Sequence, residues 1–135
     1  MMHKTLTITL LTSLLLAGIA VVNAGKGTPK KGSSKKLLRH VVLFQFKKET
    51  TKRRVDEISK TFAALPSKID AIEDFEWGTD VSVENKADGF THGFLVTFRD
   101  ANGRKQYLPH PAHQKFVKLV GPHVEKVLVF DYWAK

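Results

Sequence analysis

Hydrophobic residues in the segment LLRHVVLFQF alternate between the two sides of an extended chain. His40, Val42, Phe44 and Phe46 fall on one side of such a strand, because successive side chains point to opposite faces of a sheet. The other side is also mostly apolar, which is typical of a central strand that is covered on both faces. This segment therefore predicts a central strand.

The following segment, TKRRVDEISKTFAAL, has the period of an amphipathic helix. Its apolar residues recur every three or four positions from Val55 to Leu65, and charged residues lie between them. Thr50 or Thr51 can cap the start of the helix, and Pro66 ends it.

Four further elements follow, and they complete the order β-α-β-β-α-β. They are a strand in IEDFEWGTDVSVE, a strand in FTHGFLVTFRD, a helix divided between DANGRKQYL and HPAHQKFVKLVG, and a strand in VEKVLVFDYW. Asn102–Gly103 weakens the first part of the divided helix, and Gly121–Pro122 ends the second part. This order predicts an α+β fold of the ferredoxin-like type, with helices on one face of an antiparallel sheet.

The opposite face of the predicted sheet would stay apolar and uncovered, because both alternations of the strands are hydrophobic. A second copy of the same sheet would cover it. We therefore predict a homodimeric α/β barrel.

The first 24 residues have the features of a secretory signal peptide. A short basic start precedes the uncharged run LTITLLTSLLLAGIAVV, and small residues precede a cleavage point after Ala24. An uncleaved membrane anchor is the alternative, but the run is slightly short for a span of about 20 residues. We expect an exported protein, periplasmic or secreted, with no stable membrane insertion after cleavage. It has no cysteine and hence no disulfide.

The positive charge of the chain lies mainly outside the predicted domain. The chain carries 22 Lys and Arg against 13 Asp and Glu, a formal net charge of +9. Residues 25–36, GKGTPKKGSSKK, hold five of these lysines and no large apolar side chain, and they predict a disordered tether. Residues 37–135 carry 16 Lys and Arg against 13 Asp and Glu, so their net charge is only +3. This distribution does not favour a nucleic-acid-binding protein.

The candidate chemistry lies in the stretch YLPHPAHQKF. His113 shares a helical stripe with apolar residues, so we expect its side chain to point inward. His110 is placed to cap the helix, with Pro111 at its first position. Tyr107 ends the preceding short helix. A neutral His113 could act as a general base, and the Tyr107 hydroxyl could assist it.

Other residues are expected to line the same apolar enclosure. His40 and His92 lie on the predicted inner face of their strands, although each alone could be a satisfied core histidine. The residues predicted to bind a ligand are His40, His92, His110, Phe44, Phe94 and Phe116. Metal binding through His110 and His113 is a weaker alternative, because no cysteine exists and no carboxylate is near them in sequence. We expect no metal and no cofactor.

Several segments together resemble the stress-responsive A/B barrel domain family, called Dabb. They are RHVVLFQFK, FEWGTDVS, GFTHGFLVTF, YLPHPAHQKFV and VLVFDYW, and they extend over residues 38–133. The resemblance implies a ferredoxin-like domain that dimerises through its sheets. It also implies a polyketide-cyclase-like role, in which Tyr107 and His113 would be the catalytic pair and His40 and His92 would line the pocket.

Three functions remain open at this point. The first is a small exported dimer that holds a hydrophobic small molecule in a cavity lined by histidine and tyrosine. The second is a cyclase, isomerase or lyase that uses His113 as its base. The third is a structural oligomer without a ligand.

Overall fold

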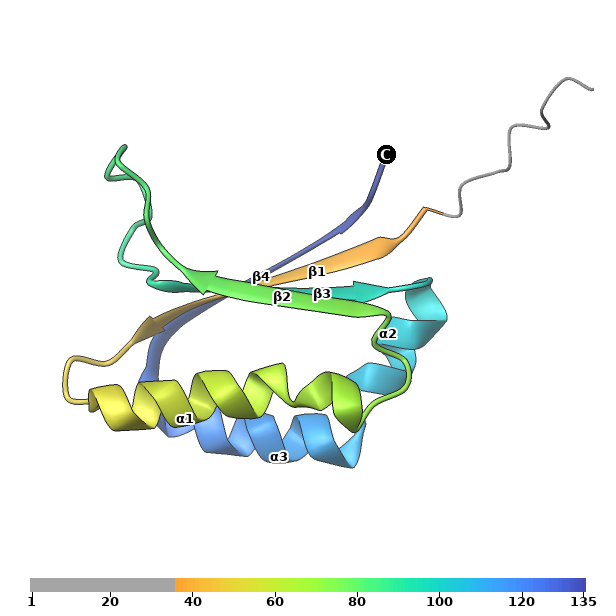
Figure 1. The fold of residues 1–135 in the computed structure, drawn as a ribbon, viewed down its shortest axis with the longest axis horizontal. Helices are drawn as coiled ribbons and strands as arrows, with labels where there is room; N and C mark the ends of the chain where they lie inside the picture. Colours follow the sequence, from red (N-terminus) through yellow and green to blue (C-terminus); the bar gives the residue numbers. More distant parts are fainter. Residues whose placement is uncertain (1–35) are drawn as a thin grey trace, which may run out of the picture. The chain divides into compact units, whose positions relative to one another are not determined.

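The computed structural model describes residues 36–135 of the chain (Figure 1). The predicted signal peptide and all but the last residue of the predicted tether lie outside the described residues. The elements follow one another in the predicted order, with two short 3-10 turns added. They are β1 (Leu38–Phe46), α1 (Lys52–Ala63), η1 (Leu65–Ser67), β2 (Asp74–Thr79), β3 (His92–Phe98), α2 (Ala101–Tyr107), α3 (Pro111–Val120), η2 (Gly121–His123) and β4 (Val124–Trp133).

The strands form one antiparallel sheet in the order β2-β3-β1-β4. Strand β1 pairs with both β3 and β4, so its predicted central place is confirmed. The helices lie on one face of this sheet (Figure 1). The predicted ferredoxin-like α+β fold is therefore confirmed.

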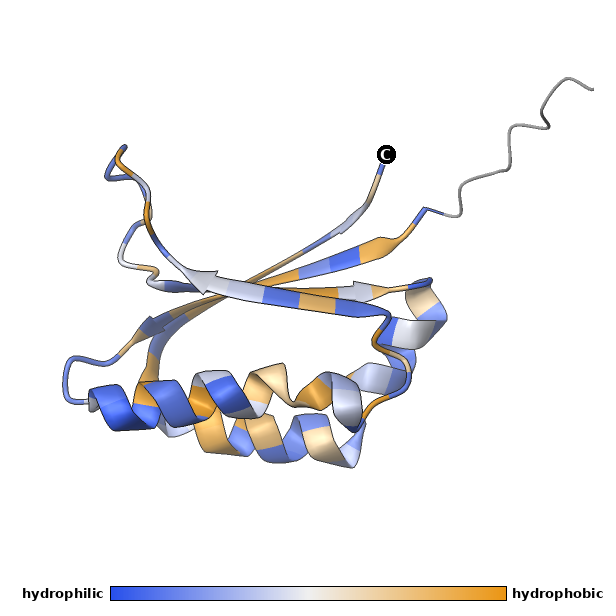
Figure 2. Cartoon of the chain, in the orientation of Figure 1, coloured by the Kyte–Doolittle hydropathy of each residue, from blue (hydrophilic) through white to orange (hydrophobic). Residues whose placement is uncertain are grey.

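The hydrophobic core lies between the sheet and the helices. Phe62 of α1 stacks on Phe116 of α3 with ring centroids 4.3 Å apart, and it packs on Phe94 of β3 at 4.6 Å. Ile58 and Phe62 of α1 are buried in this core, and polar residues alternate with the apolar ones along the helix (Figure 2). This arrangement follows from the helical stripe in α1, because apolar residues at this spacing share one side of a helix.

The second strand is shorter than predicted. The prediction placed a strand in residues 72–84, but β2 ends at Thr79 and an irregular loop leads to β3. Val81 and Val83 continue the alternation in sequence but are 87% and 98% exposed. They have no neighbouring strand to pair with, because the loop leaves the sheet. The alternation of apolar and polar residues alone therefore overestimated the length of this strand.

The helix ends follow the expected capping chemistry. The Thr51 side chain accepts a hydrogen bond from the Arg54 backbone N–H at the start of α1. Asp100 caps α2 by accepting from the N–H groups of Asn102 and Gly103. In residues 36–135 no helix is long and apolar enough to cross a membrane.

Gly103, which was predicted to weaken α2, has a packing role. A Cβ atom at this position would lie 3.2 Å from both the Ala71 carbonyl oxygen and the Phe98 Cβ. Glycine therefore lets α2 lie close to the end of β3. This close approach fixes the position of Tyr107 at the end of the helix.

Candidate functional site

A cavity of about 310 Å³ lies between the sheet and the α2–α3 segment. Its wall is mostly apolar, and its polar side chains come from β1, α2 and α3. The lining residues include His40, Val42, Phe44, Phe62, Tyr107, Leu108, His113, Phe116, Val117, Val120, Val127 and Val129. The volume is at the lower end of the range of about 300–1,000 Å³ for small-molecule sites.

The cavity opens between α3 and β4. Val117 of α3 is 43% exposed, and Val127 and Val129 of β4 are 50% and 55% exposed. All three line the cavity. Val117 lies four positions after His113 and is one of the apolar residues in its helical stripe, so this stripe is only partly buried. Strand β4 is the edge strand next to β1, and α3 leaves these valines uncovered.

His40 and Tyr107 form the inner end of the cavity. His40 is 5% exposed in β1, between the buried residues Leu38 and Val42 on the same face. Tyr107 is fully buried at the end of α2, and its ring lies edge-on to the His40 ring with centroids 5.8 Å apart. The joint between α2 and α3 then brings His113 against Tyr107, with ring centroids 4.1 Å apart. Tyr107 thus contacts two imidazoles.

The joint itself is held by hydrogen bonds to backbone groups. The His110 Nδ1 accepts from the Ala112 N–H at 3.1 Å and caps α3, which confirms the expected cap. The Leu108 carbonyl oxygen lies 2.9 Å from Nδ1 of His113 and accepts from the Gln114 side chain at 2.7 Å. Because a carbonyl can only accept, Nδ1 of His113 is the donor. Nε2 of His113 therefore acts as an acceptor when the ring is neutral.

The surroundings of His113 favour its neutral form. Burial lowers its pKa below the ordinary value of 6.5, and the bond to the Leu108 carbonyl partly opposes this. The neighbouring His40 and His110 lower the pKa of His113 further. His113 is therefore a neutral proton acceptor near pH 7, which is the state that a general base requires.

The Tyr107 hydroxyl is a buried polar group without a partner. It makes no hydrogen bond within residues 36–135. Burial raises the pKa of Tyr107, so the phenol stays protonated at any physiological pH. An unpaired buried hydroxyl costs free energy. An oxygen acceptor on a bound molecule would satisfy it.

Three of the predicted ligand-binding residues do not line this cavity. His110 is used as the α3 cap. Phe94 is 1% exposed in the core and packs on Phe44 and Phe62. His92 lies at the other end of the inner sheet face, because the antiparallel register places it opposite Phe44 rather than His40.

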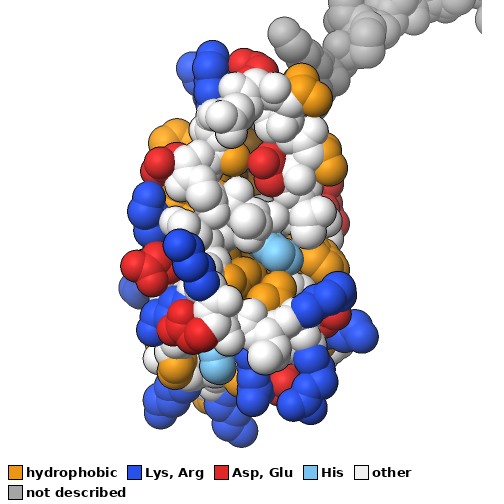
Figure 3. Space-filling view, turned by 90° about the vertical axis from the view of Figure 1, so that its left-hand side faces the viewer, with side chains coloured by type: hydrophobic (Ala, Val, Ile, Leu, Met, Phe, Trp, Pro, Cys, Tyr) orange, Lys and Arg blue, Asp and Glu red, His pale blue; other side chains and the backbone are white. Residues whose placement is uncertain are grey.

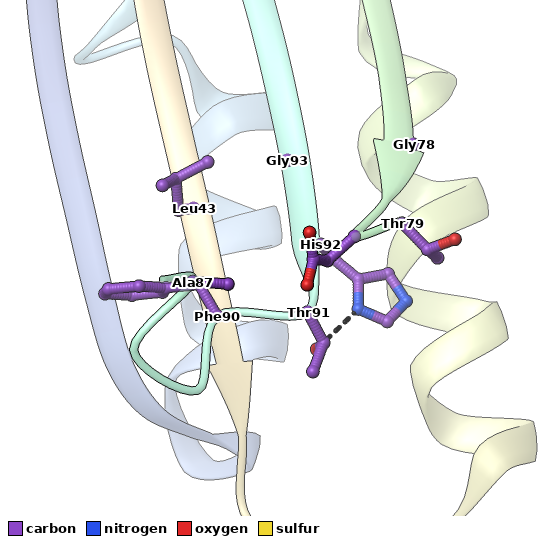
Figure 4. A pocket seen from close by; sticks show the side chains of 9 residues that line it. Leu43, Gly78, Thr79, Ala87, Phe90, Thr91, His92 and Gly93 are labelled. Atoms are coloured by element: carbon purple, nitrogen blue, oxygen red, sulfur yellow. Dashed lines mark hydrogen bonds between the residues drawn. The ribbon is translucent and has the colours of Figure 1, made fainter. Parts of the chain in front are cut away.

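His92 belongs to a different part of the surface. Its Nδ1 lies 2.9 Å from the Thr91 hydroxyl, near the loop that joins β2 and β3 (Figure 4). Its ring packs edge-on against Phe46. Burial lowers the pKa of His92, and Asp56 partly opposes this. This end of the molecule is hollowed, with hydrophobic side chains and a histidine in the hollow and basic side chains along the helices (Figure 3).

The structure adds Asp131 to the site. This residue was not among those predicted from the sequence. Asp131 of β4 is paired in register with His40, and its Oδ1 lies 2.6 Å from Nδ1 of His40. The other carboxylate oxygen accepts from Arg104 of α2. An acidic residue within the alternation Val127, Val129, Asp131 was the available signal, because it places a carboxylate on the helix-facing side of β4.

Residues 36–135 hold no group of three or more side chains of the His, Cys, Asp or Glu type that could bind a metal ion. The polar groups of the cavity are two imidazoles and a phenol in an apolar wall. Such a set can orient a small organic molecule through hydrogen bonds and can move a proton.

Comparison with known proteins places these features in a family. The sequence profile of the "Stress responsive A/B Barrel Domain" (Dabb) matches residues 38–134. Olivetolic acid cyclase from Cannabis sativa is 38% identical over 95 residues, which cover 70% of this chain and 94% of the cyclase.

Solved structures give the same result. Hydroxynitrile lyase from Passiflora edulis has a TM-score of 0.71 at 28% identity, over 75% of this chain and 95% of the lyase. A protein from Jannaschia, described as dimeric and ferredoxin-like, has a TM-score of 0.64 at 25% identity, over 71% of this chain and 97% of that protein. Together with the fold, these matches show that the chain belongs to the stress-responsive A/B barrel domain family.

Proposed function

We propose that this protein is an exported homodimer that holds a small, mostly apolar molecule with a carbonyl oxygen in the cavity beside Tyr107. The observation that carries this proposal is the buried, unpartnered hydroxyl of Tyr107, a residue that lines an apolar cavity. A carbonyl oxygen would accept from this hydroxyl, and the valines and phenylalanines would bury the rest of the ligand. The size of the cavity suits a molecule with one ring.

Two experiments test the binding function. Native mass spectrometry of the protein purified from its own host is expected to show a retained small molecule. Titration with acetophenone, an aromatic ketone, is expected to shift backbone NMR signals of the α2–α3 segment. Tyr107→Phe should weaken the binding about threefold to tenfold, because it removes one hydrogen bond. Shifts that are confined to other parts of the surface would contradict the proposal.

Acid–base chemistry is the second candidate function. The Nδ1–H of His113 is held by the Leu108 carbonyl, so Nε2 is left as a proton acceptor beside Tyr107. His113 would take a proton from the carbon next to a bound carbonyl, and Tyr107 would donate a hydrogen bond to the enolate oxygen. One of the relatives named above is a cyclase and another is a lyase.

Hydrogen exchange tests this chemistry without knowledge of the natural substrate. In deuterated water the protein is expected to speed the incorporation of deuterium into the methyl group of acetophenone. His113→Gln should abolish this effect while leaving the fold intact. Ketone binding without any protein-dependent exchange would leave the binding function and refute the catalytic one.

The outer face of the sheet supports the homodimer. Val41, Leu43, Leu128, Phe130 and Tyr132 share this face according to the strand register. Phe130 is 59% exposed, and Leu128 and Tyr132 are each 40% exposed. An apolar face of this kind is typical of an interface between proteins, and a structural relative is described as dimeric.

Light scattering of the protein without its predicted signal peptide tests the dimer. We expect twice the mass of one chain at micromolar concentration. Phe130→Glu places a charge on the apolar face and should produce monomers, whereas Lys60→Glu on the exposed side of α1 should not. A monomeric parent protein would refute the dimer. Amino-terminal sequencing tests export, because mature protein should begin at Gly25.

A further inference from the structure

Asp131 and Arg104 form a chain of hydrogen bonds that ends at His40. Asp131 Oδ1 lies 2.6 Å from Nδ1 of His40, and Arg104 donates to Asp131 Oδ2. The side chains of His40, Asp131 and Arg104 are 7%, 25% and 34% exposed. Neither Asp131 nor Arg104 lines the cavity, whereas His40 does. The two residues can therefore act on a ligand only through His40.

The bond to Asp131 determines the role of each nitrogen in His40. An ionised carboxylate has no hydrogen to donate, so Nδ1 of His40 is the donor. In a neutral imidazole Nε2 is then an acceptor. None of the hydrogen bonds found within residues 36–135 involves Nε2 of His40. The ring nitrogen that remains for a ligand in the cavity is therefore an acceptor.

Arg104 holds Asp131 in this arrangement from the other side. It occupies the second carboxylate oxygen, so Asp131 cannot rotate away from His40 without losing a charge-assisted bond. The guanidinium also balances the carboxylate charge. The three side chains come from β1, β4 and α2, and their contact joins the edge strand to the helix that carries Tyr107.

We propose that Arg104 and Asp131 are positioning residues that present Nε2 of His40 to the cavity as an acceptor, so that the ligand carries a hydroxyl donor in addition to its carbonyl oxygen. This inference rests on the proposed binding function and names the class of ligand more closely. Tyr107 donates to the carbonyl, and His40 accepts from the hydroxyl. Hydroxylated aromatic ketones have both groups on an otherwise apolar frame.

NMR of the protein without ligand tests whether Asp131 and Arg104 position His40 with its proton on Nδ1. Two-bond proton–nitrogen spectra of ¹⁵N-labelled protein distinguish the two neutral forms of histidine. We expect His40 to carry its proton on Nδ1, although isolated histidine prefers Nε2. In Asp131→Asn the amide can donate to Nδ1 in nearly the same shape, so the proton should move to Nε2. A parent protein with the His40 proton on Nε2 would overturn the proposal.

Binding of two probe ketones tests whether the site prefers a ligand that carries a hydroxyl group. The parent protein should bind 4-hydroxyacetophenone about threefold to tenfold more tightly than acetophenone, which corresponds to one hydrogen bond. Asp131→Asn should remove this preference and leave the affinity for acetophenone within about twofold. A preference that survives in Asp131→Asn would overturn the ligand class, and so would a parent protein without the preference.

Arg104 is tested by a matched pair of variants. Arg104→Leu should reduce the hydroxyl preference, and Arg104→Lys should retain part of it. Arg99→Leu removes the same charge from an exposed pair with Glu73 and should change nothing. If neither ketone binds the parent protein, the proposed function fails together with the ligand class, while the NMR result still decides the positioning of His40.

Discussion

Two neighbouring regions on the same face of the sheet have opposite characters. Around Phe62 the aromatic rings are packed against one another, and Phe62 itself is 1% exposed. Around Tyr107 the rings line an open cavity with two imidazoles and an unpartnered hydroxyl. Helices α1 and α3 cover the first region, whereas the valines of β4 are left half exposed beside the second.

The difference between these regions shows how the fold can hold a reactive site. Phe44, Phe62 and Phe116 belong to both regions, because they pack on one another and also line the cavity. The packed rings therefore form a rigid wall for the cavity. Such a wall keeps polar groups in place without hydrogen bonds among themselves, which leaves them free to bind a ligand.

The largest expected effect on stability is that of Phe62→Ala. This change removes the ring that stacks on Phe116 and packs on Phe94. A large-to-small change in a packed core costs about 3–5 kcal/mol in the free energy of unfolding. Urea unfolding followed by fluorescence measures it. A loss below about 1 kcal/mol would mean that this region collapses easily, and the contrast with the cavity would disappear.

Gly103→Ala should have a smaller effect, and its sign is informative. Alanine improves helix propensity by about 1 kcal/mol. The new Cβ would lie 3.2 Å from the Ala71 carbonyl oxygen and from Phe98, and crowding of this kind costs about 1–3 kcal/mol. We expect a net loss of stability together with NMR shifts at Tyr107. Asn102→Ala, in the exposed part of the same helix, should be neutral or slightly stabilising. A stabilising Gly103→Ala would show that α2 can move away from β3.

The sequence predicted which face of a strand or helix each residue lies on better than it predicted which residues lie next to one another in the sheet. Periodicity correctly placed His40 and Phe94 on the inner face and His110 at the α3 cap. It could not show that His92 lies opposite Phe44, because strand register depends on pairing with distant residues.

Asp131 was missed for a related reason. A single acidic residue in a hydrophobic strand reveals its role only when its neighbour across the sheet is known. That neighbour is His40, which is 91 positions away in the sequence. The cavity itself was expected from the histidine and tyrosine residues, but its open side could not be predicted, because it depends on how far α3 extends over β4.

Tyr107→Phe should scarcely change stability, in contrast with Phe62→Ala. It removes a buried hydroxyl that has no partner within the described residues, so the free energy of unfolding should stay equal or rise by up to about 1 kcal/mol. Denaturant unfolding measures this. A loss of more than about 1 kcal/mol would show that the hydroxyl already has a structural partner, such as an ordered water, and is not kept for a ligand.

The smallest effect concerns the pH dependence of stability through His113. Burial lowers its pKa in the folded protein below the ordinary value of 6.5. Below about pH 6.5 the unfolded chain therefore binds a proton at this position more readily than the folded chain does. The stability associated with neutral His113 is complete above this pH and decreases as the pH falls through it. His113→Gln should lose this part of the pH dependence.

His92 has a lowered pKa as well, so His92→Gln should remove a separate part of the pH dependence of stability. The urea midpoints of the parent and of both variants at pH 7.5 and 5.5 measure the two parts. An unchanged pH dependence in His113→Gln would show that His113 is accessible to protons in the folded protein, and the cavity would then not keep its base neutral.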